Sequence, residues 1–399
     1  MFTDPKLQSL IETGLERNTD LNVARLRVEA AEAALLTAKL SYLPSLGLNA
    51  EGNANKHDGA TAKTYNVGAS ASWELDIFGK LTAAKRGAAA ALQGSRAYRQ
   101  AVQTQLVATI ADSYYTLAML DAQMAISNRT LENWRTTVRT LEALKKVGKS
   151  NEAGVLQAKA NVMQLEASLL SIRKSISETE NALSAILAMP SHTIGRSNLA
   201  EEAFPDTVSI GVPLQLLSNR PDVRQAEMEL AQAFYATNAA RAAFYPNITL
   251  SGTIGWTNNG GGVIVNPGQW LLNAIGSLTQ PLFNRGTNIA NLKIAKSRQE
   301  EAKLLFQQSL LNAGKEVNDA LTAWQTAKSQ IEINARQVET LCDAVRKTES
   351  LMRHSNTTYL EVLTAQQSLL EAEVQQLQTR FERIQSVIKL YHALGGGRI

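Results

Sequence analysis

The sequence predicts a mainly α-helical chain built twice from the same strand–helix unit. First, the stretch from Leu21 to Leu48 recurs about 200 positions later, from Val223 to Leu250. Second, apolar residues repeat every seven positions along very long segments that contain no proline. Third, each copy carries a pair of alternating, strand-like segments just after a proline. Solenoid repeats span only roughly 20–50 residues, so the two halves are expected to play the same structural part.

Composition favours a folded, helix-rich chain and excludes several classes of protein. Hydrophobic residues make up 44% of the sequence, which is too many for a disordered chain. The 40 basic and 36 acidic residues are interspersed, so nucleic acid is not an expected partner. With Cys342 alone and four scattered histidines, neither a disulfide nor a metal site is expected. No apolar run reaches 18 residues, so no transmembrane helix is predicted.

The first half begins with two helices and a hairpin. Asp4 to Arg17 predicts a short helix, with Asp4 as its N-cap and Pro5 in its first turn. A second helix runs from about Asp20 to Ser41, and Pro44 ends it. Alternating residues then predict a hairpin over about 45–76, with strands of roughly 9–11 residues.

A very long helical pair follows each hairpin. Between Gly79 and Gly148 no proline interrupts the pattern, and a helix of nearly 70 residues would be ~100 Å long. A seven-residue apolar period keeps a seam facing a partner only if the helices supercoil left-handedly. Each half is therefore expected to carry an antiparallel pair of long coiled-coil helices. The seam residues of the first pair are Ile110, Leu117, Met124, Leu131 and Val138, then Val155, Val162, Leu169, Ile176 and Leu183.

The predicted organisation has two structural repeats and a connector. Residues 1–189 form the first repeat, with its helical hairpin at about 80–189. Residues 190–218 lose the periodicity, collect prolines and form a connector that can pack as a belt around the helices. Residues 219–399 form the second repeat, with a β-hairpin at about 247–283 and a helical hairpin at about 287–394.

The two hairpins raise a problem of closure. Their four strands are each about long enough to cross a bilayer, but about eight strands are needed to close a barrel. An open edge in lipid leaves unpaired backbone groups, so several chains would have to share one barrel. Trp73, Trp256 and Trp270 flank the strands, as the aromatic belt of a membrane sheet would. The alternative is a pair of ordinary surface hairpins, with these tryptophans in strand packing.

Four short segments stand out in the two halves: Trp73–Lys80, Leu216–Val223, Phe244–Gly252 and Leu278–Phe283. They resemble the signature stretches of the outer membrane factor family, the TolC-like efflux channels, with the efflux lipoproteins as the most similar subfamily. The segments occur in the family's order, and the resemblance covers essentially the whole chain.

The resemblance implies a homotrimer in the bacterial outer membrane that extends into the periplasm. Its fold would be mainly α with a membrane β-barrel: three chains each give four strands to a shared 12-stranded barrel. The long coiled-coil helices would form a trimeric α-barrel tunnel, with the connector at its equator. Outer-membrane lipid, a periplasmic adaptor protein and an inner-membrane pump are the implied partners. The family's leader and its frequently acylated N-terminal cysteine are expected to lie outside this sequence.

The resemblance also implies which residues meet the adaptor. The family's helix-tip motif combines a basic residue, a glycine and a small hydroxyl residue ahead of a Val-Leu or Asp-Val step. Gly154 stands where an acid is common, and Ser355 replaces the glycine. The implied contact residues are Lys146, Gly148 and Ser150 in the first half and Arg353, Ser355 and Thr358 in the second.

Glu361 is the predicted periplasmic gate residue. Three copies around a threefold axis would place like charges side by side and favour cations. Thr364 stands where the family often has a second acid, so this gate is expected to carry less charge. The alternative is that Glu361 is a solvated acid that stabilises a helix N-terminus.

An efflux channel is therefore the predicted function, with small molecules as its cargo. Type I protein secretion is the alternative within the family, and a soluble coiled-coil adaptor is the alternative from another class. The sequence holds no nucleophile–base set, phosphate loop or metal cluster, so neither an enzyme nor a cofactor is expected.

Overall fold

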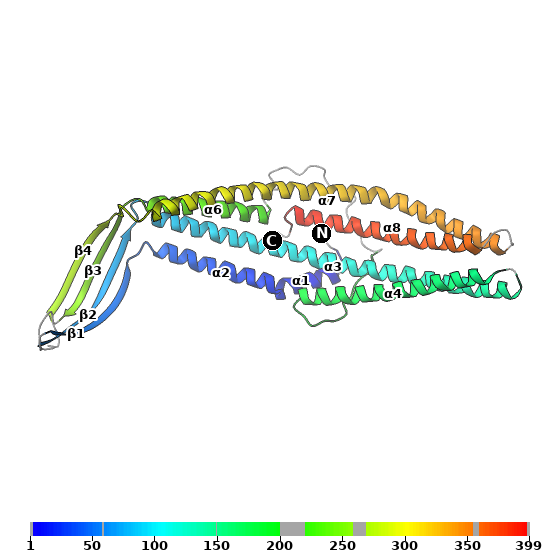
Figure 1. Cartoon of the computed structure of the whole chain (residues 1–399), viewed down its shortest axis with the longest axis horizontal. Helices are drawn as coiled ribbons and strands as arrows, with labels where there is room; N and C mark the ends of the chain where they lie inside the picture. The colour runs from blue at the N-terminus through cyan, green and yellow to red at the C-terminus, as the bar shows by residue number, and fades with distance from the viewer. Residues whose placement is uncertain are drawn as a thin grey trace. The chain divides into compact units, whose positions relative to one another are not determined.

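The computed structural model describes residues 3–57, 60–148, 150–199, 220–257, 269–353 and 359–396. Long helices dominate, and one sheet accompanies them (Figure 1), so the predicted mainly α fold class is confirmed. In chain order the elements are α1 (Pro5–Arg17), α2 (Thr19–Leu40), β1 (Ser45–His57), β2 (Ala60–Leu75), α3 (Lys80–Lys146), α4 (Glu152–Ile186), α6 (Pro221–Ala242), β3 (Asn247–Thr257), β4 (Gln269–Thr279), α7 (Thr287–Arg353) and α8 (Tyr359–Ala393).

The chain divides into two compact units. The helical unit combines Met1–Val23, Gln100–Pro221 and Leu310–Ile399. The sheet unit combines Ala24–Arg99 and Asp222–Ser309. Within the described ranges, no helix has both the length and the apolar character that crossing a bilayer requires.

Helix lengths repeat between the two halves. α2 and α6 have 22 residues each, α3 and α7 have 67, and α4 and α8 have 35. These matched lengths support the predicted duplication. The division into repeats stays a prediction, because most of the connector at 190–218 lies outside the described residues.

The start of α1 is fixed by a buried network. Asp4 caps the helix as predicted, and its Oδ1 accepts a hydrogen bond from the N–H of Lys6 at 2.8 Å. The Tyr114 hydroxyl donates to Asp4 and accepts from the N–H of Ser197 at 2.9 Å. Burial by itself raises the pKa of Asp4, but the hydrogen bonds from Tyr114 and Lys6 outweigh it and lower that pKa.

Replacing Tyr114 with phenylalanine is expected to lower the free energy of unfolding by about 2 kcal/mol, because Asp4 and Ser197 both lose a buried partner. Burial, and then the bond to Asp4, raise the pKa of Tyr114 to about 12 from 10.0. This stabilisation is complete below pH 10 and is lost as the pH rises through about 12. Denaturant titrations across that window should show a smaller loss in the variant, and identical losses would contradict the assignment.

Two quasi-equivalent joints connect the short helices to the ends of the long pairs. In the first half, Asn18 Nδ2 donates to the carbonyl of Ile186 at the end of α4, at 2.9 Å. In the second half, Arg220 donates to the carbonyl of Ala393 at the end of α8, at 3.0 Å, and to Glu316 of α7, at 2.7 Å. An amide thus closes one joint and a buried guanidinium closes the other, which gives the arginine of the Leu216–Val223 signature a structural role.

The predicted apolar seams form the core of the helical unit. Ile110 and Leu117 of α3 and Leu183 of α4 are fully buried, while Met124 and Val138 are half-buried. The core is wider than one helix pair, since α1 and α8 contribute to the same cluster. Its members include Leu7 from α1, Leu106, Ile110 and Leu117 from α3, Leu183 from α4, and Leu377, Phe381, Ile384 and Ile388 from α8.

Arg196 holds the segment that follows α4. Its guanidinium donates to both carboxylate oxygens of Asp121 in α3, at 2.5 and 2.8 Å, and to Glu180 of α4, at 2.6 Å. The hydrogen bond to Asp121 raises the pKa of Arg196, burial opposes the rise, and the bond to Glu180 adds to it. Paired, charge-assisted bonds of this kind are strong and directional, so the connector is firmly held where it begins.

The four strands form one antiparallel sheet in the order β1-β2-β3-β4. β2 and β3 join the two halves, and Gly68 lies opposite Gly255 across this joint. A Cβ on either glycine would lie 2.6 or 2.3 Å from a backbone oxygen of the facing strand, so neither position has room for a side chain. β4 ends at Thr279, short of the expected end near Phe283, because Pro281 has no N–H for the ladder.

Candidate functional site

The turn between α3 and α4 contains three of the predicted contact residues. Lys146 ends α3, and Gly148 adopts a φ of 73°, which favours glycine. Asn151 then caps α4, with its Oδ1 accepting from the N–H of Gly154 at 2.9 Å. The Ser150 hydroxyl is buried and meets no hydrogen-bond partner in the part of the chain that is described. The structure therefore places Lys146, Gly148 and Ser150 in one compact turn.

The second helix tip is described only at its borders. α7 ends at Arg353 and α8 begins at Tyr359. Ser355, Thr358 and the side chain of Arg353 lie outside the described residues. The contact role expected of these three residues stays a prediction.

Tyr359 packs on Gly154, a contact that the sequence does not predict. A Cβ added at Gly154 would lie 2.7 Å from two atoms of the Tyr359 ring, closer than real side-chain contacts allow. Gly154 is buried in the first turn of α4, and Tyr359 is the first residue of α8. Because position 154 holds glycine in place of an acid, there is room for the aromatic ring of Tyr359, which joins the tip of α8 to the tip of α4. Sequence alignment of the repeats could not find this pair, because it sets Gly154 opposite Glu361.

The predicted gate residues Glu361 and Thr364 share one exposed face of α8. They lie three residues apart, within the first two turns of the helix. The opposite face is buried, since Leu363 joins an apolar cluster with α3 and α4. That cluster consists of Leu141, Val155, Ala158 and Leu363, with Val138 and Tyr359 packed against it. Both gate residues thus lie at the same end of the helical unit as the α3–α4 turn (Figure 1).

A buried polar contact lies just beyond the gate residues. Gln366 Nε2 donates to Glu349 of α7 at 2.9 Å and to the Thr137 hydroxyl of α3 at 3.2 Å. A polar layer in an otherwise apolar helical seam fixes the register of the helices at some cost in stability. Three helices are therefore held in one register next to the tip.

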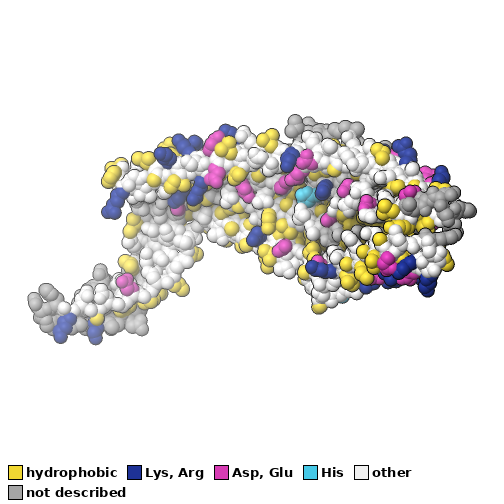
Figure 2. Space-filling model, turned by 45° about the vertical axis from the view of Figure 1, so that its right-hand side comes forward, with side chains coloured by type: hydrophobic (Ala, Val, Ile, Leu, Met, Phe, Trp, Pro, Cys, Tyr) yellow, Lys and Arg dark blue, Asp and Glu magenta, His cyan; other side chains and the backbone are white. Residues whose placement is uncertain are grey.

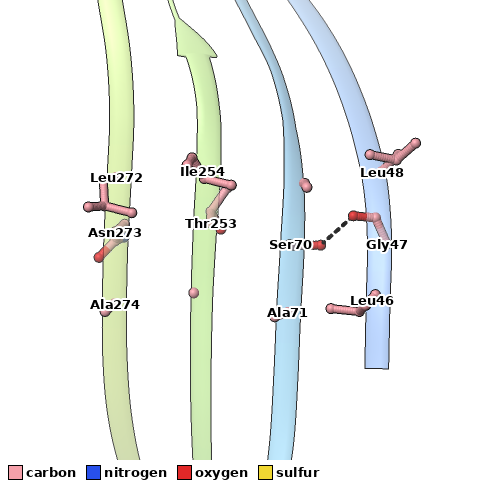
Figure 3. A pocket seen from close by; sticks show the side chains of 12 residues that line it. Leu46, Gly47, Leu48, Ser70, Ala71, Thr253, Ile254, Leu272, Asn273 and Ala274 are labelled. Carbon is pink, nitrogen blue, oxygen red and sulfur yellow. Dashed lines mark hydrogen bonds between the residues drawn. The ribbon is translucent and has the colours of Figure 1, made fainter. Parts of the chain in front are cut away.

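The sheet has one apolar face and one mostly polar face. Adjacent rows across the four strands alternate between Leu48, Ala69, Ile254 and Leu272 on one face and Gly47, Ser70, Thr253 and Asn273 on the other (Figure 3). Lys, Arg, Asp and Glu occur in the strands only as Glu51, Lys56, Lys63 and Glu74. The sheet surface is accordingly mostly white and yellow in Figure 2. Such alternation is typical of a sheet with one face against lipid.

A shallow hollow of about 580 Å³ crosses the apolar face (Figure 3). Small residues such as Ala71 and Gly252 line it between taller leucines and Ile254. Beyond it, toward the β3–β4 turn, the Trp256 and Trp270 ring centroids lie 4.9 Å apart. At the opposite end of the sheet, Trp73 Nε1 donates to the carbonyl of Tyr42 at 2.8 Å. Aromatic side chains therefore border the apolar band at both ends, as in membrane-spanning sheets.

Comparison with known proteins points to one family. A family model described as outer membrane efflux protein matches residues 10–189 and 212–396. Cation efflux system protein CusC of Escherichia coli (strain K12) is 31% identical over 406 residues, which cover 99% of this chain and 88% of that protein. Pyoverdine export outer membrane protein OpmQ of Pseudomonas putida is 31% identical over 411 residues, which cover 99% of this chain and 87% of that protein.

The fold of the chain is also similar to that of a solved structure. A crystal structure of CusC, from work on its folding and transmembrane channel formation, matches with a TM-score of 0.92 at 30% identity. The match covers 99% of this chain and 93% of the CusC chain.

Proposed function

The chain belongs to the outer membrane efflux protein family, and from this premise we propose that three copies form one exit duct that closes at its helix tips. The protein is an outer-membrane channel of tripartite efflux systems and reaches into the periplasm.

The unpaired edges of the sheet are the single observation on which the proposed trimer rests. Within the described residues, β1 and β4 each pair on one side only. In lipid, each unpaired backbone group costs several kcal/mol. Four strands are too few for a closed barrel, whereas three copies supply twelve and leave no edge.

An exposed apolar stripe on α4 supports the same assembly. Leu156, Met163 and Leu170 lie seven residues apart and are all exposed in the single chain. They form a second heptad seam, separate from the buried one that faces α3. A neighbouring copy would cover this stripe, as coiled-coil helices do.

The gate is proposed at Glu361 and Thr364. Both side chains are exposed, and the buried face of the same turn anchors α8 to α3 and α4. Three carboxylates near a threefold axis repel one another and attract cations. We place the adaptor contact on the turns that hold Lys146, Gly148 and Ser150 and, in the second half, Arg353, Ser355 and Thr358.

Glu361→Ala is expected to raise single-channel conductance in planar bilayers and to weaken the preference for cations. The physical reason is that the variant removes the ring of charge at the narrowest point. Glu178→Ala is the matched control, because Glu178 is an exposed acid of α4 that pairs with Lys174. Unchanged conductance and selectivity in the Glu361 variant would remove the basis for this gate.

The mass of the protein in detergent tests the assembly directly. A detergent-dependent trimer is expected from light scattering. A water-soluble monomer or dimer would instead favour a coiled-coil scaffold and would contradict the channel. Both relatives named above are described as exporting small solutes, cations or pyoverdine. Those descriptions support a conduit for small molecules over one for proteins.

A further inference from the structure

A cavity of about 640 Å³ lies in the helical unit, where α8 runs between α3 and α7 (Figure 1). We call it the α8 cavity. All three helices line it, and its deepest part is apolar, because Ala108 of α3, Ala320 of α7 and Ile388 and Ala393 of α8 are all buried. Sites for small molecules have volumes of about 300–1,000 Å³ and combine an apolar interior with a few polar groups. The α8 cavity therefore has the size of a small-molecule site.

The cavity lies on the side of α3 that faces away from α1. Tyr114 of α3 bonds to the N-cap of α1, and Ile110 lies against Gly14 of α1. The start of the predicted connector bonds to the same Tyr114 hydroxyl. Asp112, which lines the cavity, is two residues from both Ile110 and Tyr114, or about 200° around the helix. The α1 segment and the cavity thus occupy opposite sides of α3.

Three carboxylates line the cavity, and they differ in the partners that they have. Asp112 accepts a hydrogen bond from Gln385 of α8 at 2.8 Å. Glu316 accepts one from Arg220 at 2.7 Å.

Asp319 is the carboxylate that remains available to a ligand. Its ion-pair partner among the described residues is Lys315, 3.9 Å away and one turn earlier on the exposed side of α7. Exposed pairs of this kind contribute little.

Two basic side chains of α8, Lys389 and His392, line the same cavity. Neither side chain makes a hydrogen bond or an ion pair with a described residue. They are three residues apart, so they share one face of α8. Lys389 and Asp319 carry opposite charges in one cavity, yet they form no ion pair with each other. The α8 cavity therefore presents two separated, opposite charges above an apolar floor.

We propose that the α8 cavity binds a small amphipathic zwitterion, which is a molecule with an apolar body, an amine and a carboxylate. The amine pairs with Asp319, and the carboxylate pairs with Lys389 and accepts a hydrogen bond from the His392 ring. The apolar body covers the buried alanines. A simple cation satisfies only Asp319 and a simple anion only Lys389, so each binds more weakly.

This inference rests on the proposed function and names a class of cargo for it. In a trimer with α1 and the connector on the outside, the opposite side of α3 faces the duct. The α8 cavity then lies in the wall along which cargo passes, once in each chain.

Binding of the dipeptide phenylalanyl-leucine to the full-length protein in detergent tests the proposal. The dipeptide carries two apolar side chains and both charges, whereas its C-terminal amide keeps only the ammonium and its N-acetyl derivative keeps only the carboxylate. Equilibrium dialysis of the radiolabelled peptides measures their dissociation constants. One saturable site per chain is expected for the dipeptide. Each derivative should bind about tenfold more weakly, because it loses one charge-assisted hydrogen bond.

Two variants identify the partner of each charge. Lys389→Gln should weaken binding of the dipeptide about tenfold and leave binding of the amide unchanged, since the amide has no carboxylate. Asp319→Asn should weaken the dipeptide by a similar factor and leave the N-acetyl derivative unchanged. Both residues are exposed, so both variants are expected to fold. Lys347→Gln and Asp343→Asn are the matched controls, because both residues are exposed on α7 and do not line the cavity.

The outcomes separate the possibilities. Ala323 is an exposed residue in the α7 wall of the cavity, and Ala323→Trp should abolish binding of all three peptides. Equal affinities for the dipeptide and its amide would identify a negative surface without a carboxylate site and would overturn the inference. The absence of saturable binding, or equal losses in the control variants, would overturn it too. Light scattering on the same sample tests the proposed function separately: a trimer that does not bind contradicts only the cavity, whereas a protein that is not a trimer contradicts the duct itself.

Discussion

Replacing Arg220 with leucine is expected to lower the free energy of unfolding by about 3 kcal/mol. The side chain is 2% exposed and donates to the carbonyl of Ala393 and to Glu316. Leucine fills part of the space but leaves that carbonyl buried without its donor, at about 1–3 kcal/mol. Glu316 is half-exposed, so the loss of its partner adds only about 1 kcal/mol after screening by solvent.

Denaturant unfolding of the detergent-solubilised protein measures this loss. Arg336→Leu is the control, since Arg336 is exposed on α7 and, among the described residues, its side chain makes only a long bond of 3.4 Å to the carbonyl of Glu332 in its own helix. A change within about 0.5 kcal/mol is expected. Arg220→Lys should fall between the two, because an ammonium cannot reproduce the planar fork of the guanidinium. Equal losses in the Arg220→Leu and Arg336→Leu variants would show that the joint does not depend on this arginine.

Adding a side chain at Gly154 is expected to open the helix tip. Gly154→Leu must displace the Tyr359 ring, which lies where the new side chain would begin. Loss of a half-buried aromatic contact is expected to cost about 1.5 kcal/mol, which shifts the ratio of open to closed tips by about tenfold. Higher conductance and a larger fraction of open time in planar bilayers are the expected readouts.

A double-mutant cycle isolates the contact. Tyr359→Ala should raise conductance to a similar extent, and Gly154→Leu should add little in the Tyr359→Ala background. Leu170→Ala, in the exposed apolar stripe of α4 that a neighbouring copy is proposed to cover, measures the effect of loosening the assembly away from the tip. Fully additive effects of Gly154→Leu and Tyr359→Ala would mean that the two residues act separately.

Local chemistry made most of the fold predictable. Asp4 and Pro5 specify the start of α1 through short-range hydrogen bonds and a fixed φ. Pro44 and Gly148 limit helices because one lacks a backbone donor and the other adopts a positive φ. The buried and exposed positions of the long helices follow from the seven-residue period.

The candidate site was predictable only in part. Lys146, Gly148 and Ser150 share a turn because they are neighbours in sequence, and Glu361 and Thr364 share a face because helices repeat every 3.6 residues. The ring of Tyr359 on Gly154 has no such origin, since the two residues belong to different repeats. Aligning the repeats compares equivalent positions, and these two positions are not equivalent.

By itself the sequence determined the helix ends, the heptad seams and the alternation of the strands. Each of these rests on interactions within a few residues. Only the tertiary structure decided that Arg220 reaches Ala393, 173 positions away, that Gly68 faces Gly255, and that Tyr359 covers Gly154. Such pairs depend on how separate helices and strands are brought together in space, and no local pattern in the chain records that distance.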